Sequence, residues 1–456
     1  MSTLFGGDIQ ADAPIGGPDD LLRPFHEGIK TPDRRGIGLE YERLPLRAAS
    51  GRAAPYDAPD GSSVHAVLAR LERDHGWSAQ RESGRIIALE KGTTRLTLEP
   101  GAQVEMSGGV HHSLAAARAE LNAFVAETDR AAAAHSIVLA GLGYHPLSEF
   151  DSIGWVPKSR YQIMGPYLAS RGHLAHAMMK ATAGCQINLD YTSEADAADM
   201  LRAAMGISSV VTALCANSPL TRGQANGFAT RRSHIWMHTD PDRTGLLAIA
   251  FGDGAGFRQY VDCALDVPMM FVVRDGRWVD MTGRTFRGYL AGRTEGLKPT
   301  MADWDLHLTT LFPEVRLKRY VEVRGSDSGP PSIILAQAAL WKGILYNEAS
   351  RRAAWKLVSG PTFAERQAFH RAVVRQGLRA RLGSRPALEL ARVLITLAHD
   401  GLPESERGML DPLRALVARE GAGLSDQLLL RWRGAWGRDP LRMIEALATG
   451  TGPERD

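Results

Sequence analysis

Cysteine is scarce in this sequence, and so is net charge. The 456 residues include three cysteines, Cys185, Cys215 and Cys263, which lie far apart and form no CxxC pair. This spacing excludes a disulfide framework and a cysteine-rich zinc site, so we expect three reduced, buried thiols. The formal net charge is only +3, too small and too evenly spread for a surface that binds duplex nucleic acid. We therefore expect no nucleic-acid partner.

Targeting and membrane-spanning patterns are also missing. The opening stretch, MSTLFGGDIQADAPIGGPDD, contains no basic region followed by an apolar core, as a secretory signal would. No apolar run is long enough to predict a span of the bilayer. Hydrophobic residues make up 44% of the chain and charged residues 23%, as in ordinary globular proteins. The sequence predicts a cytoplasmic protein of enzyme size without a membrane partner.

Three common nucleotide and metal motifs are absent as well. The chain has no Walker A sequence and no HExxH, and its stretch FGDGAGF lacks the GxGxxG spacing and a clear preceding strand. These absences argue against a P-loop nucleotide site, a Rossmann dinucleotide site and a zincin-type metal site. Any nucleotide or metal chemistry must therefore use other residues.

Hydrophobic periodicity predicts strands early in the chain and helices late. RRGIGLEYERLPL and GRIIALEKG have strand patterns, and Asp275-Gly276 inside MMFVVRDGRWVDM marks a hairpin. HSLAAARAELNAFVAETDRAAAAHS has the spacing of a long amphipathic helix, and from about Trp341 the pattern is almost wholly helical. Because strands and helices do not alternate regularly, we expect an α+β fold with a mainly antiparallel sheet.

No repeat, low-complexity segment or obvious linker divides the chain. We therefore predict a single domain over residues 1–456. Its sheet core, with flanking helices, occupies about residues 20–340, and a helical C-terminal part at about 341–450 packs on that core.

Acidic residues recur on single faces of the predicted strands. In GLEYE, Glu40 and Glu42 point to one face of the strand, because side chains alternate along a strand. Adjacent like charges are costly unless the face is solvated or holds a cation. In LTLEPGAQVEMSG, Glu99 and Glu105 share a face if the strand keeps its register between them. A solvated face and a metal site are both open from this pattern.

Two further strands carry polar residues on one face. RLKRYVEVRG alternates Lys318, Tyr320, Glu322 and Arg324 with largely apolar neighbours. This fits either a salt-bridge ladder or a metal ligand next to a phosphate-binding guanidinium. CQINLD likewise places Gln186 on a polar side. Oxygen ligands of this kind suit Mg²⁺ or Mn²⁺ rather than Zn²⁺, and magnesium on a sheet suggests nucleotide chemistry.

Seven segments together resemble one family, the plant-type glutamate–cysteine ligases shared by plants and many bacteria. In the order and at roughly the spacing of that family, the chain contains GLEYE, LTLEPGAQVEMSG, WVPKSRYQIM, CQINLDY, ANSPLTRGQANGFATRRSHIWMHTDPDRTG, YVDCALDVPMMF and LTTLFPEVRLKRYVEVRG. The resemblance extends from about residue 20 to about residue 440, and we expect a bacterial member. It implies a curved antiparallel sheet like the catalytic domain of glutamine synthetase, with ATP and several Mg²⁺ ions inside.

The activity that the resemblance implies is the first step toward glutathione. ATP phosphorylates the γ-carboxylate of L-glutamate, and the amine of L-cysteine then attacks the acyl phosphate to give γ-glutamylcysteine. Matching positions imply a metal-binding set, with Mn²⁺ as an alternative ion: Glu40, Glu42, Glu99, Glu105, Glu322 and Gln186. Gln186 stands where more distant ligases have a histidine ligand.

The resemblance also assigns the substrate contacts. Arg324 and Glu322 are implied as catalytic residues, and Arg324, Lys318 and Arg243 as ATP-binding ones, although Arg243 fits a structural aspartate equally well. Two arginines are implied to grip the α-carboxylate of glutamate, since a planar guanidinium suits that bidentate task. The implied amino-acid pocket is formed by Arg160, Arg232, Tyr161, Trp236 and Met106. Core packing is the alternative for Tyr161, Trp236 and Met106.

Three rival interpretations stay open at this point. A related ligase would activate glutamate identically but use another amine. A phosphotransferase of the guanidino-kinase type would leave a phosphorylated acceptor instead of free phosphate. A non-catalytic binding protein is disfavoured, because it has no reason to tolerate so many neighbouring carboxylates. Monomer and homodimer are both open, we do not transfer thiol-based regulation, and His145 fits a loop hydrogen bond or a substrate contact.

Overall fold

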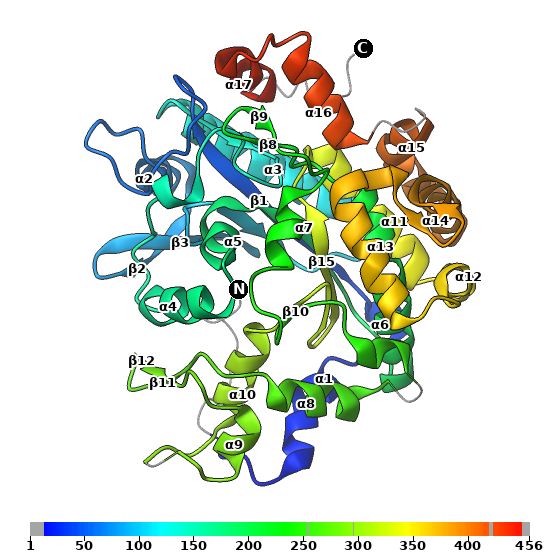
Figure 1. Cartoon of the computed structure of the whole chain (residues 1–456). Helices are drawn as coiled ribbons and strands as arrows, with labels where there is room; N and C mark the ends of the chain where they lie inside the picture. The colour runs from blue at the N-terminus through cyan, green and yellow to red at the C-terminus, as the bar shows by residue number, and fades with distance from the viewer. Residues whose placement is uncertain (1–12, 253–254, 295, 419–422, 449–456) are drawn as a thin grey trace.

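A single large antiparallel sheet organises the chain. The computed structural model describes residues 13–252, 255–294, 296–418 and 423–448 (Figure 1). Among these residues, nine strands form one sheet in the order β14-β15-β7-β1-β5-β4-β3-β2, with β6 also paired to β1. All of its pairings are antiparallel. The α+β prediction with a mainly antiparallel sheet is therefore confirmed.

The central strand is the longest, and the others extend from it on both sides. It pairs with β5, β6 and β7, and β6 extends the pairing at the C-terminal end of β1. The strands of the sheet are β1 (Ile37–Arg47), β2 (Ser78–Glu82), β3 (Arg85–Lys91), β4 (Thr94–Leu98), β5 (Val104–Ser107), β6 (Ile137–Ala140), β7 (Gly184–Leu189), β14 (Val315–Leu317) and β15 (Val321–Asp327).

Helices cover the sheet and extend past it. Figure 1 shows α5 and α7 in front of the sheet, with the C-terminal helices, yellow to red, along one side and across the top. In the first three quarters of the chain the helices are α1 (Arg23–Glu27), α2 (Val64–His75), α3 (Leu114–Ala133), α4 (Tyr161–Arg171), α5 (Ala175–Ala181), α6 (Glu194–Leu214), α7 (Arg231–Trp236), α8 (Phe257–Asp266), α9 (Phe286–Leu290) and α10 (Met301–Thr309). The remaining short strands are β8 (Leu220–Thr221), β9 (Gln224–Ala225), β10 (Thr244–Gly245), β11 (Phe271–Arg274), β12 (Arg277–Asp280) and β13 (Phe312–Pro313).

The C-terminal part is helical, as predicted, but it begins at Pro331 instead of about Trp341. Helix α11 is buried on nearly all sides, so its sequence shows no amphipathic period that would mark its start. Pro331 suits the first turn, where a missing N–H costs nothing. A short hairpin interrupts the series: α11 (Pro331–Leu345), α12 (Glu348–Val358), α13 (Phe363–Gln376), β16 (Arg381–Leu382), β17 (Arg385–Pro386), α14 (Ala387–Gly401), α15 (Asp411–Ala418), α16 (Leu424–Arg433) and α17 (Pro440–Ala448).

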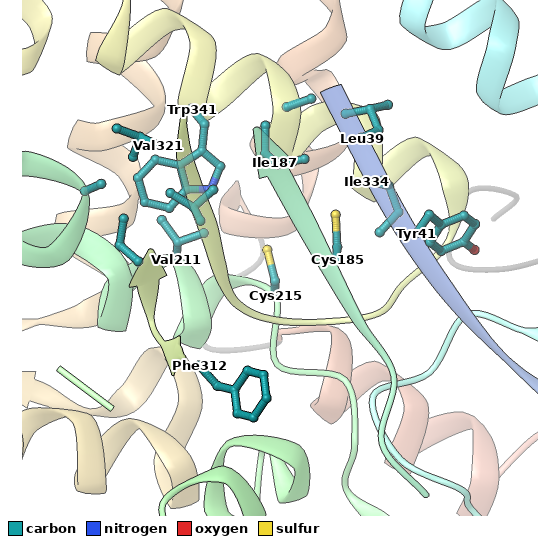
Figure 2. Close-up of a cluster of buried hydrophobic side chains, with 14 of the residues drawn as sticks. Leu39, Tyr41, Cys185, Ile187, Val211, Cys215, Phe312, Val321, Ile334 and Trp341 are labelled. Atoms are coloured by element: carbon teal, nitrogen blue, oxygen red, sulfur yellow. The ribbon is translucent and has the colours of Figure 1, made fainter. Parts of the chain in front are cut away.

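One face of the sheet is apolar and forms the main core. Figure 2 shows Tyr41 of β1, Cys185 and Ile187 of β7 and Val321 of β15 in one cluster with Ile334 and Trp341 of α11. Burial of this kind contributes about 25 cal/mol per Å² of apolar surface removed from water. The same hydrophobic cluster continues from the sheet into the C-terminal helices. Single-domain organisation stays a prediction with this continuous core in its favour.

The three cysteines are free. Cys185 and Cys215 are buried in the apolar core (Figure 2), whereas Cys263 is only partly buried. Burial raises the pKa of the Cys215 thiol, and a buried apolar setting makes a thiol unreactive. The expectation of buried thiols is therefore correct for two of the three, and it was wrong for Cys263.

From the sequence we expect no apolar run long enough to span a bilayer, but one helix of the structure does meet that criterion. By length and apolar composition alone, α6 is capable of crossing a bilayer, with a mean hydropathy of 1.3 in its best window. That window is 78% buried inside the protein, as in core helices. Helix α6 contacts β14 and β15 as well as α12, α13 and α14, so its apolar surface is used in the core.

The segment RLKRYVEVRG forms a hairpin and is not one alternating strand. Residues 318–320 turn between β14 and β15, and Arg316 lies directly across from Glu322. The prediction that Lys318 and Glu322 share a face along one strand was therefore wrong. The hairpin DG turn at Asp275-Gly276 is confirmed, because both residues have the positive φ that such a turn requires, 49° and 70°.

Candidate active site

The polar face of the sheet brings acidic residues from separate strands side by side. Glu42 of β1 pairs with Glu105 of β5, and Glu40 pairs with Gln186 of β7. Glu99 follows β4 two residues after Thr97, whose partner across the sheet is Glu105. We name the glutamates Glu40, Glu42, Glu99 and Glu105 the carboxylate row. Strand register therefore gathers Glu40, Glu42 and Glu105, and the turn after β4 adds Glu99.

Glu99 owes its place to an anchored turn. The N–H of Glu99 donates to the Gln103 carbonyl at 3.0 Å, and Ala102 has a positive φ of 70°. The Gln103 amide donates to the carbonyls of Met179 and Thr182 at the end of α5, at 3.1 and 2.9 Å. Gln103 therefore fastens the turn to α5 and does not face the row.

The carboxylate row carries more negative charge than its own contacts satisfy. Among the described residues, the buried oxygens Glu40 Oε2 and Glu105 Oε1 have no hydrogen-bond partner. Burial, aided by the charge of Glu99, raises the pKa of Glu105 to about 8, and the same two causes raise the pKa of Glu42. Such an arrangement is favourable only with cations nearby.

The carboxylate row suits a metal ion that is bound by substrate phosphates and water as well as by the protein. Within the described ranges, no three His, Cys, Asp or Glu side chains converge on one point as a closed metal site. Mg²⁺ usually keeps several waters and takes one or two carboxylates together with substrate phosphates. Carboxylates spread along adjacent strands, with buried free oxygens, match that requirement.

We expect Glu105→Gln to stabilise the metal-free protein and to remove most of its Mg²⁺-dependent turnover. The change deletes a charge that burial and Glu99 disfavour, and it deletes a proposed ligand. Thermal melting with and without Mg²⁺ measures the first effect, and initial rates measure the second. Glu90→Gln, on the exposed part of β3, is the control. A lower melting temperature for the metal-free Glu105→Gln protein would contradict the prediction.

Glu322 lies at the edge of the row and is already paired. Its two carboxylate oxygens accept from Nε and Nη2 of Arg316, the latter at 2.9 Å, and both side chains are fully buried. Although burial opposes ionisation, Arg316 and then Arg324 hold the pKa of Glu322 well below its usual range. Each oxygen keeps a second lone pair, so a role as metal ligand stays a prediction.

Arg324 reaches the row through Gln186. Arg324 Nη1 donates to Gln186 Oε1 at 2.7 Å and lies 3.3 Å from Glu322 Oε1. Gln186 Nε2 in turn donates to Glu42 Oε1 at 3.1 Å. Gln186 is thus a bridge between a cation and a carboxylate in this arrangement, and its direct contact with metal stays a prediction.

Arg232 lies on the same face, above β7. A Cβ at Gly184 would come within 2.5 Å of Arg232 Nη2, so this guanidinium rests against the glycine backbone. The Gly184 N–H donates to Glu42 Oε2 at 2.6 Å. Trp236, one turn along α7, packs under the Arg232 guanidinium. The structure therefore brings the predicted pair Arg232 and Trp236 to the carboxylate row.

Asp327 positions this arginine helix, and sequence reasoning missed it. Its carboxylate, buried at the end of β15, accepts from Thr230 Oγ1 at 2.7 Å and from Ser218 Oγ at 2.6 Å. Thr230 caps α7, and Ser218 Oγ accepts from the Arg232 N–H at 3.1 Å. The sequence shows Asp327 only as an acidic residue five positions after Glu322 in VEVRGSD. Its hydrogen-bond partners, Ser218 and Thr230, come from a loop far away in the sequence, so its role could not be predicted.

Arg160 and Tyr161 form a second group beside Glu99. Arg160 Nη2 donates to the Tyr161 hydroxyl at 3.4 Å, and Arg160 Nε is buried without a partner among the described residues. Lys158, which sequence reasoning also missed, donates to the Leu98 carbonyl at 2.7 Å. Burial, together with Arg160, lowers the pKa of Lys158 to about 7. Lys158 and Arg160 therefore bring two cationic groups close to the Glu99 turn.

An open cavity of about 630 Å³ borders this group. It lies between the β2–β3 turn and α4. Lys158, Tyr161 and Trp155 line it, and Trp155 keeps 38% of its surface exposed. A cavity of this size, with aromatic walls and the cationic side chains of Arg85 and Lys158, is large enough for an amino acid.

Two predicted contacts are corrected by the structure. Met106 is fully buried, and the side chain that precedes it, Glu105, belongs to the polar face. Met106 therefore points into the apolar core and does not line the amino-acid pocket. Arg243 is fully buried, with Nε 2.6 Å from Asp240 Oδ2 and other donors on the Thr310 carbonyl, Tyr167 and Pro268. The structural-aspartate alternative holds for Arg243.

Lys318 and His145 lie outside the carboxylate row. Lys318 is in the β14–β15 turn with its ammonium 4.9 Å from the centre of the Tyr320 ring, and its ATP contact stays a prediction. His145 is fully buried, and neither ring nitrogen has a partner among the described residues. Burial lowers its pKa to about 3. A loop hydrogen bond through the His145 ring is therefore not formed here.

Comparison with known proteins gives consistent matches over nearly the whole chain. A sequence model described as glutamate-cysteine ligase family 2 matches residues 36–441. The chloroplastic glutamate–cysteine ligase of Medicago truncatula is 40% identical over 423 residues, which cover 91% of this chain and 82% of that protein. The chloroplastic glutamate–cysteine ligase of Arabidopsis thaliana is 39% identical over 435 residues, covering 94% and 82%.

A solved structure has the same fold. The glutamate–cysteine ligase of Francisella tularensis, solved in complex with AMP, superposes with a TM-score of 0.57 over 94% of this chain and 90% of that one. Their sequence identity is 13%, so this likeness concerns the fold alone. The predicted ligase-type sheet is confirmed by it.

Proposed function

This chain belongs to glutamate–cysteine ligase family 2 and is a glutamate–cysteine ligase of the first step of glutathione synthesis, and from this premise we propose how its residues perform the reaction. The observation that carries the proposal is the carboxylate row with the guanidiniums of Arg324 and Arg232 beside it. Opposite charges on one polar face are what a triphosphate, divalent cations and an amino-acid carboxylate require together.

The first chemical step transfers a phosphoryl group to glutamate. An oxygen of the γ-carboxylate attacks the γ-phosphorus of ATP, the bond to the β–γ bridging oxygen breaks, and ADP leaves. Mg²⁺, held by the row (Glu40, Glu42, Glu99 and Glu105), would neutralise phosphate charge when bound. Arg324 stabilises the negative charge of the transferred group, and Gln186 and Glu322 hold its guanidinium in place.

Glutamate is held by arginines from two elements. Arg232 on α7 approaches Glu42, and Arg160 precedes α4 near Glu99. The α-carboxylate requires such a cationic grip, since a guanidinium binds it by two parallel hydrogen bonds. Fixing the amino acid at this end leaves the γ-carboxylate directed at the nucleotide, which makes the reaction effectively unimolecular.

The second step forms the amide bond. The neutral amine of cysteine attacks the acyl carbon, the carbon–oxygen bond to phosphate breaks, and the extra proton on nitrogen is lost. We place the acceptor in the cavity beside Lys158 and Tyr161, because it is continuous with the Glu99 turn through the Lys158 contact to Leu98. Trp155 and Tyr161 provide the apolar wall that a thiol side chain favours.

Three finer points belong to the same proposal. We place the chain among the bacterial members of the family and in the cytoplasm, on the sequence patterns described above. Magnesium is the proposed ion, on the chemistry of the row. Monomer and homodimer remain alternative states.

Product analysis tests the function. Purified protein with ATP, Mg²⁺ and glutamate should release free phosphate only when cysteine is added, and mass spectrometry should find γ-glutamylcysteine. Parallel reactions with alanine, glycine and 2-aminobutyrate measure acceptor choice. Release that is equal for all amines would contradict cysteine as the acceptor. A stable phosphorylated acceptor without free phosphate would instead indicate a kinase.

A further inference from the structure

The strand that carries Arg324 is irregular at that residue. In the pairing of β15 with β7, Val323 lies opposite Ile187 and Ser326 lies opposite Cys185, so three steps on β15 match two on β7. Arg324 and Gly325 are therefore together opposite Gln186. A bulge of this kind re-aims a side chain and is frequent next to active sites. Here it directs the Arg324 guanidinium at Gln186 Oε1, 2.7 Å away.

Glu314 lies under the bulge and contacts it twice. Its carbonyl accepts from the Arg324 N–H at 3.0 Å. A Cβ at Gly325 would come within 2.0 Å of Glu314 Oε2, and within 3.0 Å of Thr212 Oγ1. A side chain at position 325 would therefore have to displace the Glu314 carboxylate, which lies directly against the Gly325 backbone.

Side chains of three helices surround this carboxylate. His370 of α13 has Nε2 at 3.8 Å from Glu314 Oε1, and its Nδ1 lies 3.0 Å from Ser209 Oγ of α6. Among the described residues, Glu314 Oε2 and Gln337 Nε2 of α11 have no hydrogen-bond partner. Both line an enclosed cavity of about 10 Å³, which Arg324 and Gly325 also line. That volume is the size of one water molecule between polar groups.

A buried carboxylate in this place needs an explanation. Glu314 is 8% exposed, and a carboxylate without a full set of hydrogen bonds costs several kcal/mol. An apolar residue of similar size would avoid that cost. The surrounding polar atoms come from α6, α11 and α13, so the carboxylate lies where three helices face one point on β15.

We propose that Glu314, oriented by His370, is a positioning residue for Arg324 and acts through the Arg324–Gly325 bulge. It touches no substrate: it sets the place of the Arg324 backbone, and the arginine then stabilises the transferred phosphoryl group. The proposal rests on the function proposed for Arg324. It adds residues behind Arg324, namely Glu314 and His370, which lie between helices α6, α11 and α13 and the site of phosphoryl transfer.

A double-mutant cycle tests the coupling. We expect Glu314→Gln to lower kcat by about ten- to a hundredfold, because small displacements of a positioned group have effects of that size. The KM for glutamate should change by less than about threefold, since Arg324 is not part of the glutamate grip. In an Arg324→Lys background, Glu314→Gln should add less than about a twofold loss, because both changes affect one interaction.

Glu406→Gln is the matched control. Glu406 is also a buried glutamate, 5% exposed and 2.7 Å from Lys342, but it joins α11 to the loop before α15 and does not contact β15. It should leave kcat within about twofold in either background. If Glu314→Gln lowers kcat equally in the wild-type and Arg324→Lys backgrounds, or no more than Glu406→Gln does, the positioning role is overturned.

Two further measurements keep the outcome decisive. Should Glu314→Gln fail to fold, Gly325→Ala replaces it: its Cβ displaces the Glu314 carboxylate, so it should lower kcat in the wild-type background and add less than about a twofold loss in the Arg324→Lys background. An equal loss in both backgrounds overturns the proposal. Crystal structures provide a readout without turnover, since the contact from Arg324 Nη1 to Gln186 Oε1 should be lost in Glu314→Gln. A wild-type enzyme without cysteine-dependent phosphate release contradicts the proposed function, whereas an unchanged contact contradicts the positioning role.

Discussion

Replacing Arg324 by alanine is expected to lower kcat at least about a thousandfold, the scale of an arginine that stabilises a transferred phosphoryl group. Arg324 is 9% exposed, and its guanidinium lies between Gln186 and Glu322. Lysine at this position keeps a charge but not the planar fork, so Arg324→Lys should recover only part of the rate. Initial rates of cysteine-dependent phosphate release measure both variants.

Arg351 provides the control for this prediction. It is 7% exposed and pairs with Asp196 at 2.8 Å, so it matches Arg324 in burial and charge but lies on α12. Arg351→Lys should keep kcat within about threefold and alter only the melting temperature. A rate for Arg324→Ala within about tenfold of the wild type would remove Arg324 from the chemical step.

Replacing Glu322 by glutamine is expected to destabilise the fold by about 3–5 kcal/mol and to abolish turnover as well. The sequence alone suggests a modest effect on folding, but the structure adds a buried partner. Arg316 is 1% exposed, and in Glu322→Gln its charge would lose its buried counter-charge; among the described residues it would keep the carbonyls of Thr309 and Leu311 and one amide oxygen. Urea unfolding gives the free energy, and phosphate release gives the rate.

A paired replacement separates the two roles of Glu322. Arg316→Met with Glu322→Leu removes both charges and keeps most of the volume, so it should regain much of the lost stability. Turnover should stay abolished, because the carboxylate is also a proposed metal ligand. A double variant that recovers both stability and rate would show that Glu322 is only a structural ion-pair partner. Glu322→Gln with wild-type stability would show that the buried pair contributes little.

The alternation of side chains along a strand made much of the site predictable. Because side chains alternate along a strand, the letters GLEYE alone place Glu40 and Glu42 on one face, and hydrophobic alternation places Tyr41 on the other. The same rule, applied to Glu105, should have placed Met106 in the core. Core packing, the alternative that the sequence left open for Met106, follows from this rule, whereas the resemblance alone assigned Met106 to the amino-acid pocket.

Pairing between distant segments could not be predicted from the sequence. Nothing in RLKRYVEVRG distinguishes one long strand from a tight hairpin, yet only the hairpin puts Arg316 on Glu322. The bulge at Arg324 and Gly325 depends on Glu314 and on helices α6, α11 and α13. The Asp327 contact with the cap of α7 joins residues nearly a hundred positions apart.

By itself, the sequence determined the type of sheet, the shared face of Glu40 and Glu42 and the family to which the chain belongs. Backbone geometry makes those properties local, so they survive without knowledge of neighbours. Only the tertiary structure decided which carboxylates share a row, which arginines already have partners and which buried groups lie behind them. These depend on register and burial, and both are set by contacts between segments far apart in the chain.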